Sequence, residues 1–245
     1  MTSSERTRVV RDGFSLGVAV GSYGVAFGAT ATTAGLSVWQ ASLLSLLMFT
    51  GASQFALVGV LAAGGGPFAA VGGALLLGTR NTIYGVRLAE QLSYQGWRRI
   101  AAAHWVIDET TALTVRQNGQ KLSRLAFVTS GAALFLFWNL TTLAGAVGAQ
   151  SFGPVLQAAL DSVVPAAFLA LLWPRLVRGA ELLREQRIVA AGGVVIALAL
   201  TPVLVPGMQI IVASTAVLLA IATPPAESDT TPSVEDPQPC SGGSA

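Results

Sequence analysis

Long stretches without charged side chains restrict the fold of this chain more than any other feature. No Asp, Glu, Lys or Arg occurs in residues 13–79 or 188–226, and Asp161 is the single charge in residues 125–174. A helix needs roughly 20 mostly apolar residues to cross a bilayer, so these stretches have room for several crossings. A transmembrane barrel would show short alternating segments instead. The sequence therefore predicts an all-α polytopic membrane helix bundle with about six to eight hydrophobic segments.

The composition agrees with this fold class and argues against several others. Hydrophobic residues make up 53% of the chain and charged residues 11%, against about a quarter charged in soluble domains. The net charge of +2 comes with basic residues in short loops, which favours membrane orientation over nucleic-acid binding. One Cys (Cys240) and one His allow no internal disulfide and no metal cluster, so we expect no metal and no cofactor.

The chain divides into three parts. Residues 1–12 form a short basic segment, residues 13–223 contain the hydrophobic runs, and residues 224–245 are polar, proline-rich and acidic. We predict a cytoplasmic N-terminal segment, a transmembrane domain and a disordered tail. Two shorter apolar runs, 188–203 and 207–223, are predicted to pair as a terminal hairpin.

Charge positions also predict that some hydrophobic segments do not cross completely. Basic clusters lie at residues 6–11, 87–99, 116–124 and 175–187. Short cytoplasmic loops carry an excess of Lys and Arg, so we expect all four clusters on that side. Three full crossings between the first two clusters would break the rule. Residues 38–63 are therefore predicted to be broken or re-entrant, and residues 100–115 either dip into the membrane and return or lie along its surface.

Glycines repeat along the first hydrophobic run. Gly13, Gly17, Gly21, Gly24 and Gly28 recur every four or three residues and so form one stripe on a helix. Small residues in such a stripe let another helix approach closely. We interpret the stripe as a helix-packing surface.

Polar residues interrupt the second hydrophobic run at Gly51, Ala52, Ser53 and Gln54. Glycine weakens a helix, and the hydroxyl and amide beside it can satisfy freed backbone groups, so a discontinuous helix is one prediction. Broken helices at mid-membrane are where transporters commonly bind substrates. The alternative is a continuous helix with an interhelical hydrogen bond.

Arg80 and Asn81 lie in the next apolar run. An arginine at mid-bilayer costs about 2.5–3.5 kcal/mol on the insertion scale, so it should pair, line a wet cavity or snorkel to the surface. Asn81 beside it favours a polar pocket. Further along, Trp138 is interpreted as an interface aromatic and Asn139 as an interhelical hydrogen-bond donor or acceptor.

Three acids are candidates for proton coupling. His104 and Asp108 are four residues apart and would share one face of a continuous helix, with Glu109 pointing elsewhere. Asp161 precedes the kink residue Pro165 by one turn. Acids at membrane depth commonly mark ion paths. The alternatives are a solvated interfacial segment for the first pair of acids and a structural partner of Arg80 for Asp161.

Several motifs together resemble the AzlC-like family, the large subunit of branched-chain amino acid exporters. They are YGVAFGATATTAGLSVWQASLLSLLMFTGASQFALVGVLAAG, LLLGTRNTIYGVRLA, DETTAL, FWNLTTLAGAVGA and DSVVPAAFLALL, in family order across residues 23–172. The matching positions are Gly51, Ala52, Gln54, Arg80, Asp108, Glu109, Asp161 and Pro165. One departure is Asn81, where the family usually has histidine.

This resemblance implies a multi-pass permease of the bacterial inner membrane, not an enzyme. It would export valine, leucine, isoleucine and in some members methionine, driven by the proton gradient, with a small AzlD-type membrane partner. Gly51, Ala52, Ser53, Gln54, Arg80 and Asn81 are the predicted substrate-binding residues, and Asp108, Glu109 and Asp161 the predicted proton-coupling residues. Transport of another small solute, an intramembrane hydrolase and a non-transporting scaffold subunit remain as alternatives.

Overall fold

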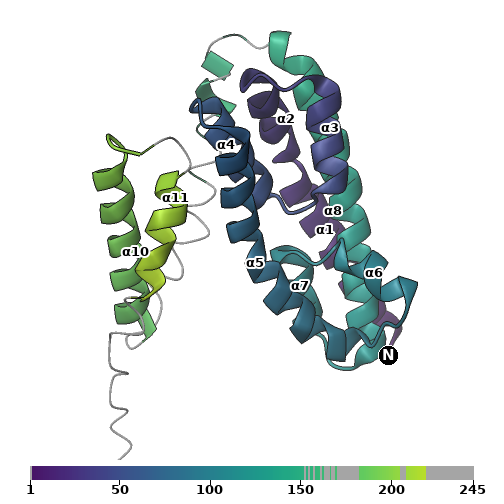
Figure 1. Cartoon of the computed structure of the whole chain (residues 1–245). Helices are drawn as coiled ribbons and strands as arrows, with labels where there is room; N and C mark the ends of the chain where they lie inside the picture. Colours follow the sequence, from purple (N-terminus) through teal and green to yellow (C-terminus); the bar gives the residue numbers. More distant parts are fainter. Residues whose placement is uncertain are drawn as a thin grey trace, which may run out of the picture.

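A computed structural model describes residues 2–151, 182–204 and 208–218, with isolated positions between 153 and 169. These residues form an all-helical arrangement without strands, shown in Figure 1. The first part of the chain contains α1 (Ser3–Gly21), α2 (Gly24–Thr33), α3 (Val38–Leu47), α4 (Ala52–Ala62), α5 (Pro67–Leu92), α6 (Trp97–Ala103), α7 (Asp108–Val115), α8 (Gln120–Gly148) and η1 (Ala149–Ser151). The C-terminal part contains α10 (Leu182–Leu200), α11 (Met208–Ala213) and η2 (Ser214–Val217). The predicted all-α class is confirmed.

The first helix begins before the hydrophobic run does. Thr2 caps α1, because its hydroxyl accepts from the Glu5 N–H while the Glu5 carboxylate accepts from the Thr2 N–H. A short interruption at Ser22 and Tyr23 separates α1 from α2. Taken together, residues 3–33 are long and apolar enough to cross a membrane, and the same holds for α8.

α1 and α2 pack in parallel along α8. A methyl group at Gly17 would overlap Ala133, one at Gly21 would overlap Phe137, and one at Gly28 would overlap the backbone of Thr142. The Thr141 hydroxyl also donates to the Gly21 carbonyl at 2.5 Å. The contacts advance together along both helices, so α1 and α2 run in the same direction as α8. The glycine stripe provides the close approach between them.

The second hydrophobic run is two helices instead of one. α3 starts at a capping box formed by Ser37 and Gln40, and it ends at Leu47. Residues 48–51 follow, and Gly51 takes φ +57° and ψ −80°, a conformation that favours glycine. α4 then runs back toward the end of the bundle where α3 began. The predicted break in residues 38–63 is confirmed, and it is a re-entrant hairpin.

α5 spans the whole bundle. Pro67 occupies its first turn, where proline needs no hydrogen-bond partner. Its 26 residues give a length of about 39 Å. α5 runs antiparallel to α4, and Gly78 near its middle faces the Ser53 side chain near the start of α4. The starts of α4 and α7 therefore lie near its midpoint, because Arg80 contacts α7 there.

A second re-entrant hairpin enters from the opposite end. α6 ends at Ala103, residues 104–107 are not helical, and α7 returns from Asp108. The expectation that residues 100–115 dip in and return is met. The prediction that His104 and Asp108 share one helical face is wrong, because the helix is interrupted between them and Ile107 has extended backbone.

Hydrogen bonds gather the end of α5, the end of α7 and the start of α8 at the end of the bundle that holds the N-terminus (Figure 1). The Gln91 amide donates to the Thr114 carbonyl at 3.0 Å and to the Ser123 hydroxyl at 2.8 Å. Arg124 donates to the carbonyls of Leu92 and Ser93 at 2.7 and 3.0 Å. We refer to this end as the basic end.

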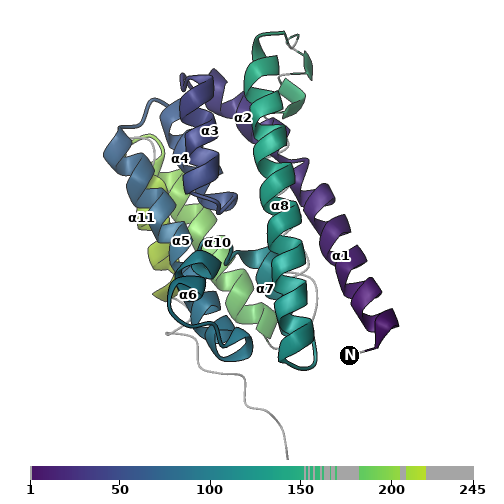
Figure 2. The ribbon, with the colours of Figure 1, turned by 90° about the vertical axis from the view of Figure 1, so that its right-hand side faces the viewer.

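The C-terminal helices pack against one another. α10 contacts α11 and η2, and α11 also contacts α5, where Ile211 lies near Gly72. The pairing predicted for the two terminal runs is therefore seen between α10 and residues 208–217, while residues 205–207 and 219–223 lie outside the described residues. Figure 2, turned by 90°, shows α8 and α1 on one side of the bundle and α5 with α10 and α11 on the other.

Candidate functional site

An ion pair lies where α5 meets the start of α7. The Nη1 atom of Arg80 is 2.8 Å from the Oδ2 atom of Asp108. Arg80 is near the midpoint of α5, and Asp108 is the first residue of α7. The side chains are 34% and 30% exposed, so neither is sealed inside protein. Pairing lowers the cost of holding both charges at this depth.

The pair leaves part of its hydrogen-bonding capacity unused. Within the described residues, Nε of Arg80 and Oδ1 of Asp108 are buried without a partner, as is Oδ1 of Asn81. Thr50 and Thr111 each have a buried hydroxyl in the same condition. Buried polar atoms normally find partners in folded proteins. The unpaired atoms of Arg80 and Asp108 themselves therefore indicate a place for a polar ligand or water at the ion pair.

The start of α4 contributes further polar groups near the middle of the bundle, at about the same height as the ion pair. The side-chain Oε1 of Gln54 accepts from the Gly51 N–H at 3.0 Å, and the side-chain Nε2 donates to the Leu44 carbonyl at 3.4 Å. Gln54 and Ser53 are buried, while Gly51 and Ala52 are partly exposed. Gln54 thus holds the broken ends of α3 and α4 together instead of projecting into open space.

The tips of the two hairpins meet. Nε2 of His104 lies 2.9 Å from the Leu46 carbonyl, and the His104 ring is 6.2 Å from the ring of Phe49. Phe49 and His104 both contact Phe135, which lies at the middle of α8, with ring centroids 5.0 and 5.8 Å away. Half-helix ends from opposite directions therefore converge near the midpoints of α5 and α8. Such ends present unpaired N–H and C=O groups.

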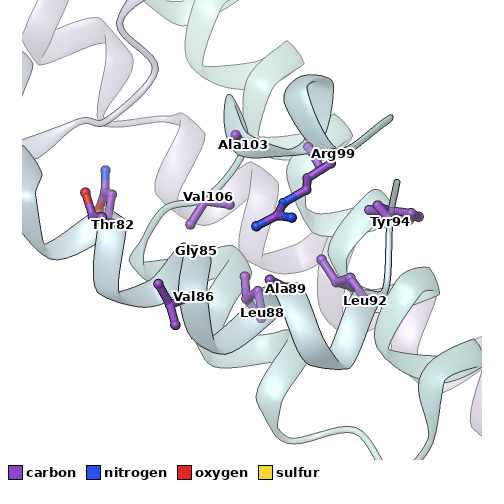
Figure 3. Close-up of a pocket in the computed structure, with 12 residues that line it drawn as sticks. Thr82, Gly85, Val86, Leu88, Ala89, Leu92, Tyr94, Arg99, Ala103 and Val106 are labelled. Carbon is purple, nitrogen blue, oxygen red and sulfur yellow. The ribbon is translucent and has the colours of Figure 1, made fainter. Parts of the chain in front are cut away.

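Two cavities lie along α5, one on each side of the place where the two hairpins meet. One, of about 490 Å³, is lined by the end of α3 and the first break, by Ser53, by the middle of α5, and by Ala103, His104 and Val106 at the tip of the second hairpin. The other, of about 420 Å³, lies between α6 and the last half of α5 and is shown in Figure 3. In that view the Arg99 guanidinium points between α6 and α5 toward Leu88 and Val106. Apart from Arg99, Tyr94, Asn81 and Thr82, the walls of this second cavity are apolar.

The structure brings some of the predicted residues together and leaves others apart. Arg80 and Asp108 are paired, and Glu109 follows on α7 within electrostatic range of both. Asn81 lines both cavities, and Ser53 lines the larger one. Asp161 and Pro165 lie outside the described residues, so their predicted roles receive no structural account.

Several polar residues at this level were not predicted as binding residues. The sequence contains many Ser and Thr residues, and nothing in the spacing of Thr50 and Thr111 distinguishes these two from the rest. Arg99 was counted with a basic cluster, although it lines a cavity. Trp138 was expected at the membrane surface but is 4% exposed and stacks on Phe27. Asn139 was expected to bond another helix, but it donates to the Phe135 carbonyl of its own helix.

The described residues contain no group of three or more His, Cys, Asp or Glu placed to hold a metal ion. The polar groups that are present include a cation, two acids, amides, hydroxyls and helix ends. This set suits a small solute that carries both charges.

The fold and the site define a membrane protein with two re-entrant helical hairpins that meet beside an ion pair. A family model described as "AzlC protein" matches residues 15–152, more than half of the chain, and this chain belongs to that family. It is also 28% identical over 157 residues to "Inner membrane protein YgaZ" of Escherichia coli (strain K12). The aligned part covers 60% of this chain and 63% of that relative, less than two thirds of its length. No solved structure matches the chain.

Proposed function

We propose that this chain is the large subunit of a secondary transporter that exports branched-chain amino acids. The substrates would be valine, leucine and isoleucine, with methionine as a further candidate. Family membership supports a membrane role, and the mid-bundle site supports a small zwitterionic solute. The observation that carries the proposal is the partly exposed ion pair of Arg80 and Asp108 beside the meeting point of the two hairpins.

An amino acid has a carboxylate and an ammonium group that match the two members of this pair. The carboxylate would bind Arg80, whose Nε is buried and unpaired. The ammonium would bind Asp108, whose Oδ1 is also unpaired. A substrate that replaces one ion pair by two such contacts keeps both charges satisfied during transport. Asn81, Thr50 and the helix start at Gly51–Gln54 would complete the polar part of the site.

The surrounding walls favour an apolar side chain. Leu47, Phe49 and Leu75 line the larger cavity, and Val86, Leu88 and Leu92 line the smaller one. Binding sites of this kind use a few polar groups for orientation and apolar walls for selectivity. A branched aliphatic side chain would gain about 0.8 kcal/mol for each methylene removed from water.

Proton coupling is assigned to the acids of the site. Asp108 and Glu109 bring two negative charges beside one arginine, so the uptake of one proton would bring this group to neutrality. Asp161 remains a third candidate. Under the positive-inside rule the basic end lies in the cytoplasm, and the N-terminus with it. We also propose a small AzlD-type membrane subunit as partner.

The first test is efflux of valine, leucine, isoleucine and methionine from peptide-fed cells that express this chain with and without such a partner. Export that requires Arg80 would support the proposal. Arg80→Lys keeps the charge but loses the planar fork that binds a carboxylate through two donors, so we expect reduced efflux. Arg80→Gln is expected to abolish efflux.

The matched control is Arg11→Gln, because Arg11 forms an exposed ion pair with Asp12 at 3.6 Å, away from the site. This variant should export like the unmodified chain. Absence of all four effluxes, with folded protein shown in the membrane, would overturn the substrate assignment. Efflux of a different solute would point to another transporter specificity, and a protein without any transport would favour a scaffold subunit.

A further inference from the structure

The core contains the same architecture twice, in opposite directions. α3 and α4 are joined by the break 48–51, and the turn 63–66 leads into α5. α6 and α7 are joined by the break 104–107, and the turn 116–119 leads into α8. The breaks and the turns all have the same length, while the helices they join differ.

The two breaks also close in the same way. The Gly51 N–H donates to the side chain of Gln54, three residues later, at 3.0 Å. The Ile107 N–H donates to the side chain of Thr110, again three residues later, at 3.2 Å. In this register Asp108 occupies the position of Ala52. The acid that pairs with Arg80 therefore stands at the first helical position after a break, as Ala52 does in the other hairpin.

The two units enter the bundle from opposite ends. Arg124 at the start of α8 reaches the last carbonyls of α5, so the two long helices run in opposite directions. The α6–α7 hairpin enters from the basic end and the α3–α4 hairpin from the other end (Figure 1). Their tips meet through His104 and the Leu46 carbonyl. Repeats of inverted topology in transporters place the binding site between them.

The two cavities follow this arrangement. The larger one lies against the α3–α4 hairpin, and the smaller one lies against α6. Four residues line both of them: Asn81, Thr82, Ala103 and Val106. We call these four residues the neck. Arg80, which holds Asp108, is adjacent in sequence to the neck.

We propose that the two cavities are the two halves of one path for a small zwitterionic solute with an apolar side chain. The neck separates the halves, the α6–α7 hairpin closes the half at the basic end, and the α3–α4 hairpin closes the other. This rests on the proposed function for the identity of the solute, but the two-sided geometry stands on the structure alone. Exchange between two closures of inverted topology is how one unit would admit solute from each side in turn.

The test is the accessibility of single cysteines from the two sides of the membrane. Cys240 is the only cysteine, so Cys240→Ser provides a background without thiols. Thr79→Cys places a thiol in the larger cavity, and Ala89→Cys places one in the smaller cavity. A charged, membrane-impermeant thiol reagent is applied to right-side-out and inverted vesicles that contain the full chain.

We expect Ala89→Cys to react from the side of the basic end and Thr79→Cys from the opposite side. Ile83→Cys is the control on the same helix, because Ile83 is 70% exposed but lines neither cavity. A thiol facing lipid does not ionise and should not react from either side. Reaction of Thr79→Cys and Ala89→Cys from the same side would overturn the two-sided path, as would reaction of Ile83→Cys at their rate.

Failure of this inference is distinguishable from failure of the proposed function. Labelling requires no transported solute, so opposite-sided labelling without amino acid efflux would keep the path and reject the substrate. Efflux with same-sided labelling would keep the substrate and reject the path. Thiol variants that do not reach the membrane are replaced by Gly78→Cys and Ala102→Cys, which line the same two cavities.

Discussion

Arg80 and Asp108 connect the middle of a long helix to the first residue of a half-helix, with 2.8 Å between Nη1 and Oδ2. The connection therefore holds the tip of the α6–α7 hairpin against α5. Under the proposed function, a solute that binds Arg80 or Asp108 would weaken this connection. Binding would then be coupled to movement of the hairpin.

Neutralising the acid tests this coupling. In Asp108→Asn the arginine stays at membrane depth without its partner. We expect efflux to fall at least about tenfold and the unfolding free energy to fall by about 1–2 kcal/mol, less than for a sealed pair because both side chains are partly exposed. Efflux assays and thermal unfolding in detergent measure the two effects. Asp12→Asn at the exposed pair should change neither, and full efflux by Asp108→Asn would contradict the role given to the pair.

The backbone at Gly51 is a second sensitive position. Its φ of +57° with ψ −80° is strained for any residue with a side chain. We expect Gly51→Ala to cost about 1–3 kcal/mol and to reduce efflux, because the start of α4 would shift. Gly73→Ala is the control, since Gly73 is helical and has no atom within 4 Å of an added methyl group. Equal melting temperatures for the two variants would show that the break tolerates other conformations.

The contact between α2 and α8 depends on the absence of a side chain. We expect Gly28→Ala to lower the unfolding free energy by about 1–3 kcal/mol, because the new methyl group overlaps the Thr142 carbonyl. Gly59→Ala has open space around it and should stabilise α4 by up to about 1 kcal/mol. Thermal unfolding in detergent compares them. A Gly28→Ala protein as stable as the unmodified one would mean that the helices do not approach so closely.

Arg124 joins the start of α8 to the end of α5. Its guanidinium donates to two carbonyls and lies 5.0 Å from the Tyr94 ring. We expect Arg124→Met to cost about 1–2 kcal/mol and to increase amide exchange in the last turn of α5, because those carbonyls lose their partner. Lys121→Met, on the exposed side of the same turn, is the control. Unchanged exchange in α5 would contradict the capping role.

The positions of the basic residues correctly predicted that two segments are interrupted. Side-chain spacing did not predict which residues within these segments share a helical face. The positive-inside rule constrains the number of complete crossings. It therefore shows that a segment returns to the same side, but not where the segment turns. The prediction that His104 and Asp108 share one helical face was wrong because a spacing of four residues places side chains together only on an unbroken helix. The interruption depends on the extended Ile107 and the Thr110 hydroxyl, a local hydrogen bond that composition does not reveal.

The ion pair of Arg80 with Asp108 was not predicted from the sequence, where Asp161 was the acid named as a possible partner. Only the path of the chain shows that the start of α7 brings Asp108 to α5. The prediction for Trp138 was also wrong. Aromatic residues suit the membrane surface, but Trp138 lies near the middle of α8 and its ring packs on Phe27 inside the bundle.

Gly21 and Thr141 touch although they are 120 residues apart in the chain. During synthesis, the first helix must therefore wait in the bilayer until nearly the whole core has been inserted. Throughout that interval its glycine face has lipid as neighbour instead of α8. A chain truncated before α8 would keep this glycine face without the helix that packs on it. We expect such a chain to be degraded, even when its first helices are correctly oriented.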